Sequence, residues 1–150
     1  KWAVENGTLI GRGSPGCLFT NRDNFRNFHC RVEAKISNGG NSGLFFRAKY
    51  TPTGNPPGYE AQIDGSGILR DVQRTGSIYN LAKITTMQHK PNEWFTLEVI
   101  AKGAQLVTKL NGKTMTDIKD NRFTIGRIAL QQHHNGSVVH FRKIEIHEFE

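Results

Sequence analysis

The sequence has 150 residues, which is enough for one domain with a hydrophobic core and short for two domains of ordinary size. We therefore expect residues 1–150 to form a single domain. Hydrophobic residues make up 36% of the chain, and its 16 glycines and 5 prolines indicate a turn-rich globular protein instead of a disordered one. There is no apolar run of membrane-spanning length and no charged-then-apolar leader, so the sequence predicts neither a membrane span nor a signal peptide.

The net charge is +7, from 20 basic and 13 acidic residues. The basic residues are scattered, and residues 29–35 mix both signs along one face, as is typical of a solvated strand surface. We therefore expect no specific nucleic-acid partner. The first residues already look like a strand, which is compatible with a mature or trimmed form of a longer protein.

Four Asn-Gly dipeptides punctuate the chain. They suit type I′ hairpin turns, because both central residues of such a turn need a positive φ. Short segments of alternating apolar and polar residues flank them, as is typical of antiparallel strands. The dipeptides are Asn6-Gly7, Asn38-Gly39, Asn111-Gly112 and Asn135-Gly136. Repeated tight turns of this kind predict an all-β fold, either a meander or a jelly roll.

Apolar alternation predicts where the strands lie. Every second residue from Phe28 to Ile36 is apolar, which predicts a half-buried strand, and the same period recurs in residues 95–101 and 106–110.

Three irregular segments interrupt this pattern. The parity of the apolar residues changes across Arg142 and Lys143, which predicts a β-bulge there. The proline-rich stretch 51–58 is expected to be a surface loop between two strands, and residues 78–87 a loop with a short helical turn.

Two sequence features invite a chemical role without supporting one. Residues 11–16 match the pattern GxGxxG, but a dinucleotide site needs a following helix, and residues 17–20 look like a strand. No cofactor is therefore predicted. Cys17 and Cys30 permit a disulfide but do not require it, since both lie in alternating apolar segments where buried free thiols are common.

A first polar cluster depends on the turn at Asn135-Gly136. If this turn closes a hairpin, Gln131 opposes His140, and both share a face with His133. The cluster would hydrogen-bond a ligand, or it would be the solvated rim of a hairpin. Two histidines without a third nearby ligand make a weak zinc site, so no metal site is predicted.

A second polar cluster lies in residues 58–64. Alternation puts Glu60, Gln62 and Asp64 on one face of a strand. Arg47 has the parity that would bring it beside Glu60 if the proline loop joins two neighbouring strands. The alternative is an ordinary exposed strand face with a salt bridge.

Six short motifs resemble, in order, those of the 3-keto-disaccharide hydrolase domain, over nearly the whole chain. They are NSGLFFR at 41–47, GYEAQI at 58–63, TGSIY at 75–79, NEW at 92–94, LNG at 110–112, and IALQ at 128–131 with FRKI at 141–144. The resemblance implies an antiparallel β-sandwich, a concanavalin-like jelly roll that holds a carbohydrate ligand on its concave sheet. It also implies bacterial origin and a periplasmic or extracellular location.

The resemblance also implies a chemistry. Related glucanases carry two carboxylates in an ExDxE pattern, whereas here Gln62 takes the middle place, which argues against direct hydrolysis by a carboxylate pair. A sugar oxidised at C3 has an acidic proton at C2, so the group at C1 can leave by elimination, followed by addition of water. That route needs one base, a stabiliser for the enolate and a proton donor.

Within this scheme we expect Glu60 or His133 to be the base and Arg47 to stabilise the enolate, with a divalent metal ion as an alternative to Arg47. The expected substrate-binding residues are Gln62, Asp64, Gln131, Tyr79 and His140. The competing hypothesis is a non-catalytic carbohydrate-binding module, because jelly rolls bind glycans with similar polar faces.

Overall fold

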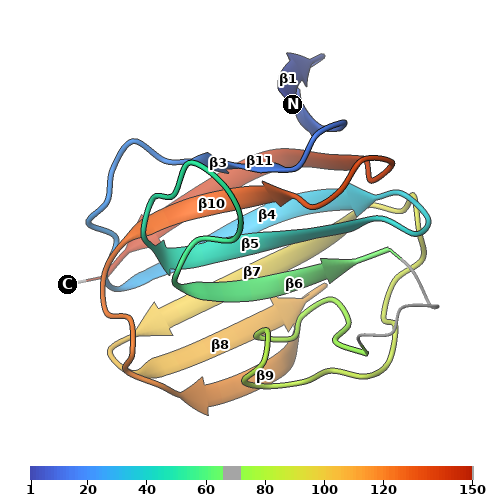
Figure 1. The fold of residues 1–150 in the computed structure, drawn as a ribbon. Helices are drawn as coiled ribbons and strands as arrows, with labels where there is room; N and C mark the ends of the chain where they lie inside the picture. Colours follow the sequence, from blue (N-terminus) through green and yellow to red (C-terminus); the bar gives the residue numbers. More distant parts are fainter. Residues whose placement is uncertain (66–71, 150) are drawn as a thin grey trace.

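A computed structural model describes residues 1–65 and 72–149. Every regular element in these ranges is a β-strand, and the strands form two antiparallel sheets that pack face to face (Figure 1). The all-β antiparallel sandwich predicted from the sequence is therefore confirmed. The described ranges contain no helix that could cross a lipid bilayer.

We refer to the two layers as the large sheet and the small sheet. The large sheet contains, in spatial order, β1 (Trp2–Glu5), β2 (Thr8–Gly11), β11 (Val139–Glu148), β4 (Phe28–Ile36), β7 (Phe95–Lys102), β8 (Gln105–Leu110) and β9 (Lys113–Lys119). The small sheet contains β3 (Gly16–Phe19), β10 (Arg127–Gln132), β5 (Asn41–Ala48) and β6 (Tyr59–Asp64).

The core lies between the two sheets and follows the period of two. β4 buries Phe28 and every second residue through Ile36 completely, which confirms the predicted strand. Phe46 of β5 and Ile63 of β6 meet them from the small sheet. The larger of these side chains, such as Phe28, Ile36 and Phe46, each stabilise the fold by roughly 1.5–3 kcal/mol through removal of apolar surface from water.

The four Asn-Gly dipeptides divide into two kinds. Asn6-Gly7 (φ 51° and 72°) joins β1 to β2, and Asn111-Gly112 (φ 49° and 81°) joins β8 to β9, both as the predicted hairpins. Asn38-Gly39 and Asn135-Gly136 instead lead from one sheet to the other, so the hairpins expected there do not form. Alternation and turn residues alone do not distinguish a hairpin from a crossing between sheets.

The predicted irregularities are present. The pairing of β11 with β4 shifts between Arg142 and Glu145, and Lys143 has φ 50°, which confirms the bulge. The proline loop joins β5 to β6 and lies in front of the small sheet (Figure 1). In the 78–87 loop, the amides of Leu81 and Ala82 both donate to the carbonyl of Ile78, which makes the single turn expected there.

The outer edge of β6 is covered by residues 76–79. The amide of Gln62 donates to Ser77 O, and the amide of Tyr79 donates to Glu60 O, each at 2.9 Å. These bonds satisfy an edge that would otherwise expose unpaired backbone groups. They also hold Tyr79 next to Glu60.

Candidate functional site

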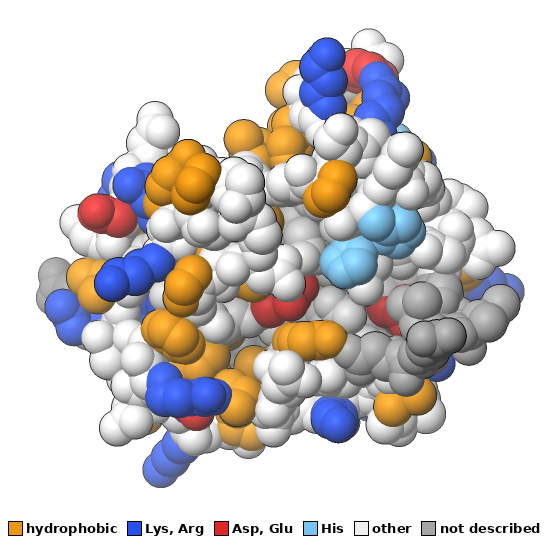
Figure 2. Space-filling view, in the orientation of Figure 1, with side chains coloured by type: hydrophobic (Ala, Val, Ile, Leu, Met, Phe, Trp, Pro, Cys, Tyr) orange, Lys and Arg blue, Asp and Glu red, His pale blue; other side chains and the backbone are white. Residues whose placement is uncertain are grey.

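The face of the small sheet that points away from the core carries the candidate site, and we call it the site face. In β6 the side chains of Tyr59, Ala61 and Ile63 enter the core, so Glu60 and Gln62 lie on the site face, as predicted. Figure 2 shows this side of the molecule, with a hollow near its centre. Glu60 is only 7% exposed and Gln62 only 3%, which is unusual for polar side chains outside the core.

Gly43 makes room for the carboxylate of Glu60. In the pairing of β5 with β6, Gly43 lies opposite Gln62, and Phe45 lies opposite Glu60. A Cβ atom added to Gly43 would lie 2.2 Å from Oε2 of Glu60 and 2.9 Å from its Cγ. The side chain of Glu60 therefore lies across Gly43, in space that the side chain of any other residue at position 43 would fill.

Gln131 of β10 borders the same space from the other side. Leu130 pairs with Leu44, so Gln131 lies next to Gly43 on the site face, and it is 3% exposed. Its Nε2 donates to Oδ1 of Asn55 at 2.8 Å, while its Oε1 is buried without a hydrogen-bond partner. A buried amide oxygen without a partner is costly, and a ligand hydroxyl would satisfy it.

Two cavities open over this arrangement, and Asn55 of the proline loop lines both. The β10 cavity, about 450 Å³, is bordered by Gln131 and His133. The β6 cavity, about 330 Å³, is bordered by Glu60 and Tyr79. Both volumes are in the range that small-molecule sites occupy, roughly 300–1,000 Å³.

His133 lies at the exposed end of the β10 cavity. Its Nδ1 is 2.9 Å from Nδ1 of His134, so one of these two nitrogens donates to the other. Burial lowers the pKa of His133, and the neighbouring His134 lowers it further. The neutral form of His133 is thereby favoured, and this form can accept a proton.

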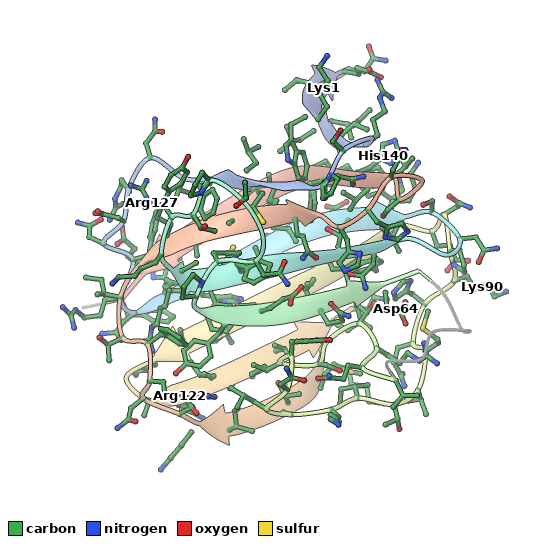
Figure 3. All side chains as sticks on the ribbon, in the orientation of Figure 1. Lys1, Asp64, Lys90, Arg122, Arg127 and His140 are labelled. Atoms are coloured by element: carbon green, nitrogen blue, oxygen red, sulfur yellow. The ribbon has the colours of Figure 1, made fainter. Side chains whose placement is uncertain are left out.

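Asp64 lies on the site face but outside both cavities (Figure 3). It is fully buried, and its Oδ2 accepts a hydrogen bond from Arg74 at 2.8 Å. The backbone amide of Asp64 donates to Oγ1 of Thr75 at 2.9 Å. These contacts fix Asp64 at the end of β6.

The prediction that Arg47 lies beside Glu60 is wrong. Arg127 pairs with Ala48 and Ala129 with Phe45, so β5 contains one more residue than β10 between these pairs. This bulge gives Arg47 a φ of 48° and ends the alternation.

The guanidinium of Arg47 is instead tied to the backbone. Its nitrogens donate to the carbonyls of Arg26, Gly103 and Phe123 at 2.6–3.2 Å, and the residue is 2% exposed. Arg47 fastens three segments to one another and is unable to reach an enolate on the site face.

The placement of His140 with Gln131 is wrong for a different reason. Since β10 and β11 belong to different sheets, the two residues are not opposite each other. His140 pairs with Ile10 and Lys35 on the large sheet, and its ring meets the edge of Trp94 (Figure 3). It therefore takes no part in the site.

The remaining sequence-based expectations concern metals, thiols and the glycine pattern. No three His, Cys, Asp or Glu side chains within residues 1–65 and 72–149 are grouped to hold a metal ion. Cys17 and Cys30 are free thiols on different sheets. Residues 11–16 connect β2 to β3, a strand, so the helix that a dinucleotide loop requires does not follow them.

Sequence reasoning missed Gly43 and Asn55 as site residues. Gly43 has no functional group, and Asn55 lies in a loop whose path over the sheet has no local sequence signal. A glycine inside an otherwise apolar strand was the available clue, because it often marks a close approach of another group.

Comparisons with known proteins agree with this fold. Among solved structures, a candidate glycosyl hydrolase from Parabacteroides distasonis is similar, with 23% identity, a TM-score of 0.86, and coverage of 99% of this chain and 83% of that one. The CBM66 carbohydrate-binding module from Bacillus subtilis has 18% identity and a TM-score of 0.79, covering 99% of this chain and 91% of that one.

The exoplasmic/lumenal domain of VIP36, in a form bound to Ca²⁺ and Man3GlcNAc, has 12% identity and a TM-score of 0.73, covering 99% of this chain and 81% of that one. These likenesses place the sandwich among the jelly rolls. A search of curated proteins finds no match. The family model for the 3-keto-alpha-glucoside-1,2-lyase-like domain matches residues 1–147, so the chain belongs to that family.

Proposed function

We propose that this protein cleaves 3-keto-glucosides, with Glu60 as the base that removes the proton from C2. Family membership supports a carbohydrate-related role. The observation that carries the proposal is the carboxylate of Glu60, nearly buried across Gly43 and flanked by Gln62 and Gln131. A single carboxylate with amide groups on both sides supplies a base and neutral hydrogen-bond donors, which are two of the groups that elimination needs.

The proposed reaction has two stages. Glu60 takes the C2 proton, and the electron pair of that C–H bond moves to the C3 carbonyl oxygen as an enolate. The enolate then collapses to re-form C3=O and to make a C1=C2 double bond, and the group at C1 leaves with the electrons of the C1–O bond. Water adds across C1=C2 in the second stage, which gives the free 3-keto sugar.

We assign Gln62 as the donor to the enolate oxygen or to a neighbouring hydroxyl. It lies opposite Gly43, next to Glu60 on the same strand, and is 3% exposed. A donor aimed at developing charge in a water-poor site is worth far more than one in bulk water. Because the described donor set does not fit a metal ion, no step is assigned to one.

The test is turnover of 3-keto-glucosides by Glu60→Gln, with Glu145→Gln on the outer face of the large sheet as the matched control. Loss of a positioned base predicts a fall in kcat of about 10²- to 10⁴-fold for Glu60→Gln, and wild-type activity for the control. A panel of unoxidised glucosides tests the need for the C3 carbonyl. Equal turnover by Glu60→Gln and wild type would contradict the role of Glu60.

The second candidate is a non-catalytic carbohydrate-binding module. The partnerless Oε1 of Gln131 favours it, because accepting a hydrogen bond from a sugar hydroxyl requires no catalysis. Measurable affinity for glucosides, without turnover of any 3-keto sugar by the wild-type protein, would establish this alternative. Either role suits an extracytoplasmic location such as that of the VIP36 domain, which is described as exoplasmic or lumenal.

A further inference from the structure

The site face divides into a polar half and an apolar half. The polar half is formed by Glu60, Gln62 and Gln131 around Gly43. The apolar half is a separate cluster outside the main core, made of Phe45, Ala48 and Ala129 with Cys17 and Phe19 packed against them. Figure 2 shows hydrophobic side chains gathered to the left of the hollow on this face and histidine side chains to its right.

Two aromatic rings border the apolar end of the β10 cavity. Tyr50 is 62% exposed, and its ring meets the ring of Phe19 edge-on at a centroid distance of 5.1 Å. An exposed tyrosine on a cavity wall contributes little to the core, whereas it offers a large, rigid contact surface to a ligand. The cavity, about 450 Å³, greatly exceeds the roughly 150 Å³ that suffices for a benzene ring.

Hydrogen-bonding groups are scarce at this end of the cavity. The hydroxyl of Thr51 donates within the loop to Thr53 O. The Nε2 of Gln132 donates to the carbonyls of Gly13, His134 and Ser137. Burial raises the pKa of Cys17 to about 11, with the charge of Glu60 adding to the effect, so its side chain stays a neutral thiol. Apart from the Oε1 of Gln132, which is buried without a partner, these groups offer a second sugar few hydrogen bonds, so most of its hydroxyls would lack partners.

The acid–base groups are also poor donors to a leaving group, since the neutral form of His133 is favoured by its lowered pKa. Of the carboxylates on the site face, Asp64 is bound to Arg74, and Glu60 is required as the base. A leaving group with a low pKa needs little help from an acid. Phenols have a pKa near 10, like the tyrosine side chain, and a phenolate leaves C1 far more readily than a sugar alkoxide does.

We propose that the apolar end of the β10 cavity, bordered by Phe19 and Tyr50, binds the leaving group and selects glucosides whose aglycone is an aromatic ring. The proposal rests on the proposed function, since it assigns the sugar to Glu60 and the aglycone to the neighbouring cavity. The C1–O bond breaks, its electron pair stays on the phenolic oxygen, and the phenolate then takes a proton from water.

The experiment compares Tyr50→Ala with wild type on 3-keto phenyl and 3-keto methyl α-glucoside. Leu18→Ala, an exposed apolar residue on the same strand as Phe19, is the control. Tyr50→Ala is expected to lower kcat/KM for the phenyl substrate by about 3- to 10-fold and to leave the methyl substrate within about 2-fold. Since Tyr50 is mostly exposed, thermal unfolding should be unchanged, and its measurement confirms that the variant folds.

Binding of unoxidised phenyl and methyl α-glucoside is measured in parallel, because it does not depend on catalysis. If Tyr50→Ala affects both compounds equally, or if wild type binds the phenyl compound no more tightly than the methyl one, the aglycone site is overturned. If neither 3-keto substrate is cleaved while tighter phenyl binding still depends on Tyr50, the proposed function fails and the aromatic site stands.

Discussion

The outer faces of the two sheets carry polar residues at the same period of two, but the exposure of these residues to solvent differs between the sheets. On the large sheet, the side chains of Arg31 and Glu145 pair in the open, at 53% and 58% exposure, although Glu33 and Glu98 are only 21% and 12% exposed. On the small sheet, Glu60 and Gln62 are nearly buried, and Glu60 borders a cavity. Polar alternation therefore produces a solvated surface on one sheet and a site on the other.

The loops make this difference. The proline loop crosses the small sheet and places Asn55 against Gln131, and residues 76–79 run along the edge of β6. On the large sheet, Trp94 lies over Arg142, while the pair of Arg31 with Glu145 stays more than half exposed. The comparison teaches that burial of a polar face identifies a site better than its composition does.

The largest expected effect on stability lies next to the site, at Arg47. Arg47→Ala removes the donors that serve three backbone carbonyls in a buried place, and we expect a loss of about 3 kcal/mol in the free energy of unfolding. Urea denaturation measures it. A loss below about 1 kcal/mol would show that these carbonyls find other hydrogen-bond partners. Arg47 would then contribute as little to stability as the exposed charges of the large sheet do.

Gly43→Ala tests whether the space over β5 holds the carboxylate in place. The new methyl group would collide with the side chain of Glu60, which can rotate away, so the fold should survive while the carboxylate moves. Displacing a catalytic group by about 1 Å costs on the order of 100-fold in rate, or about 2.7 kcal/mol. We expect kcat to fall by this factor with an unchanged melting temperature. Full activity would contradict the proposed geometry.

Asp120, which is hydrogen-bonded to two residues that border the β6 cavity, makes the stability of this region sensitive to acid. Burial alone would raise the pKa of its carboxyl, but hydrogen bonds from Tyr59 and Arg122 outweigh it and hold that pKa at about 2, below the ordinary 3.8. The resulting stability is present above about pH 4 and is lost as the pH falls through about 2.

Tyr59→Phe removes one of these hydrogen bonds. Unfolding free energies measured between pH 5 and pH 2 should therefore fall less steeply for this variant than for wild type. An identical pH dependence in both proteins would show that the hydroxyl of Tyr59 does not stabilise the charged form of Asp120.

The smallest effect is expected on the large sheet. Arg31→Ala removes an exposed ion pair with Glu145, which should change the free energy of unfolding by at most about 0.5 kcal/mol and leave turnover unchanged. A larger loss of stability would weaken the distinction between the two faces.

Much of this contrast could be predicted from the sequence. The alternation in residues 28–36 and 58–64, the bulge at Lys143 and the two hairpin turns at Asn6 and Asn111 depend on local geometry, and each is present. The same period also placed Glu60 and Gln62 on one face of their strand. Local rules work wherever a strand continues without interruption.

The failures share one physical cause, which is that the chain leaves its local pattern. At Arg47 a single extra residue in β5 turns the side chain off the site face. At Asn135-Gly136 the chain passes to the other sheet, which carries His140 away from Gln131. Neither the bulge nor the crossing between sheets leaves a signal in the local amino-acid composition, so each is visible only in the pairing of the strands.

The position of β10 between β3 and β5 also has a consequence for how the protein acquires its site. Gly43 and Glu60 lie on paired strands joined by one loop, whereas Gln131 lies on a strand more than sixty residues further along the chain. Such distant pairings form slowly. A glycoside that needs both sides of the hollow can therefore bind only finished molecules, and its binding would report that folding is complete.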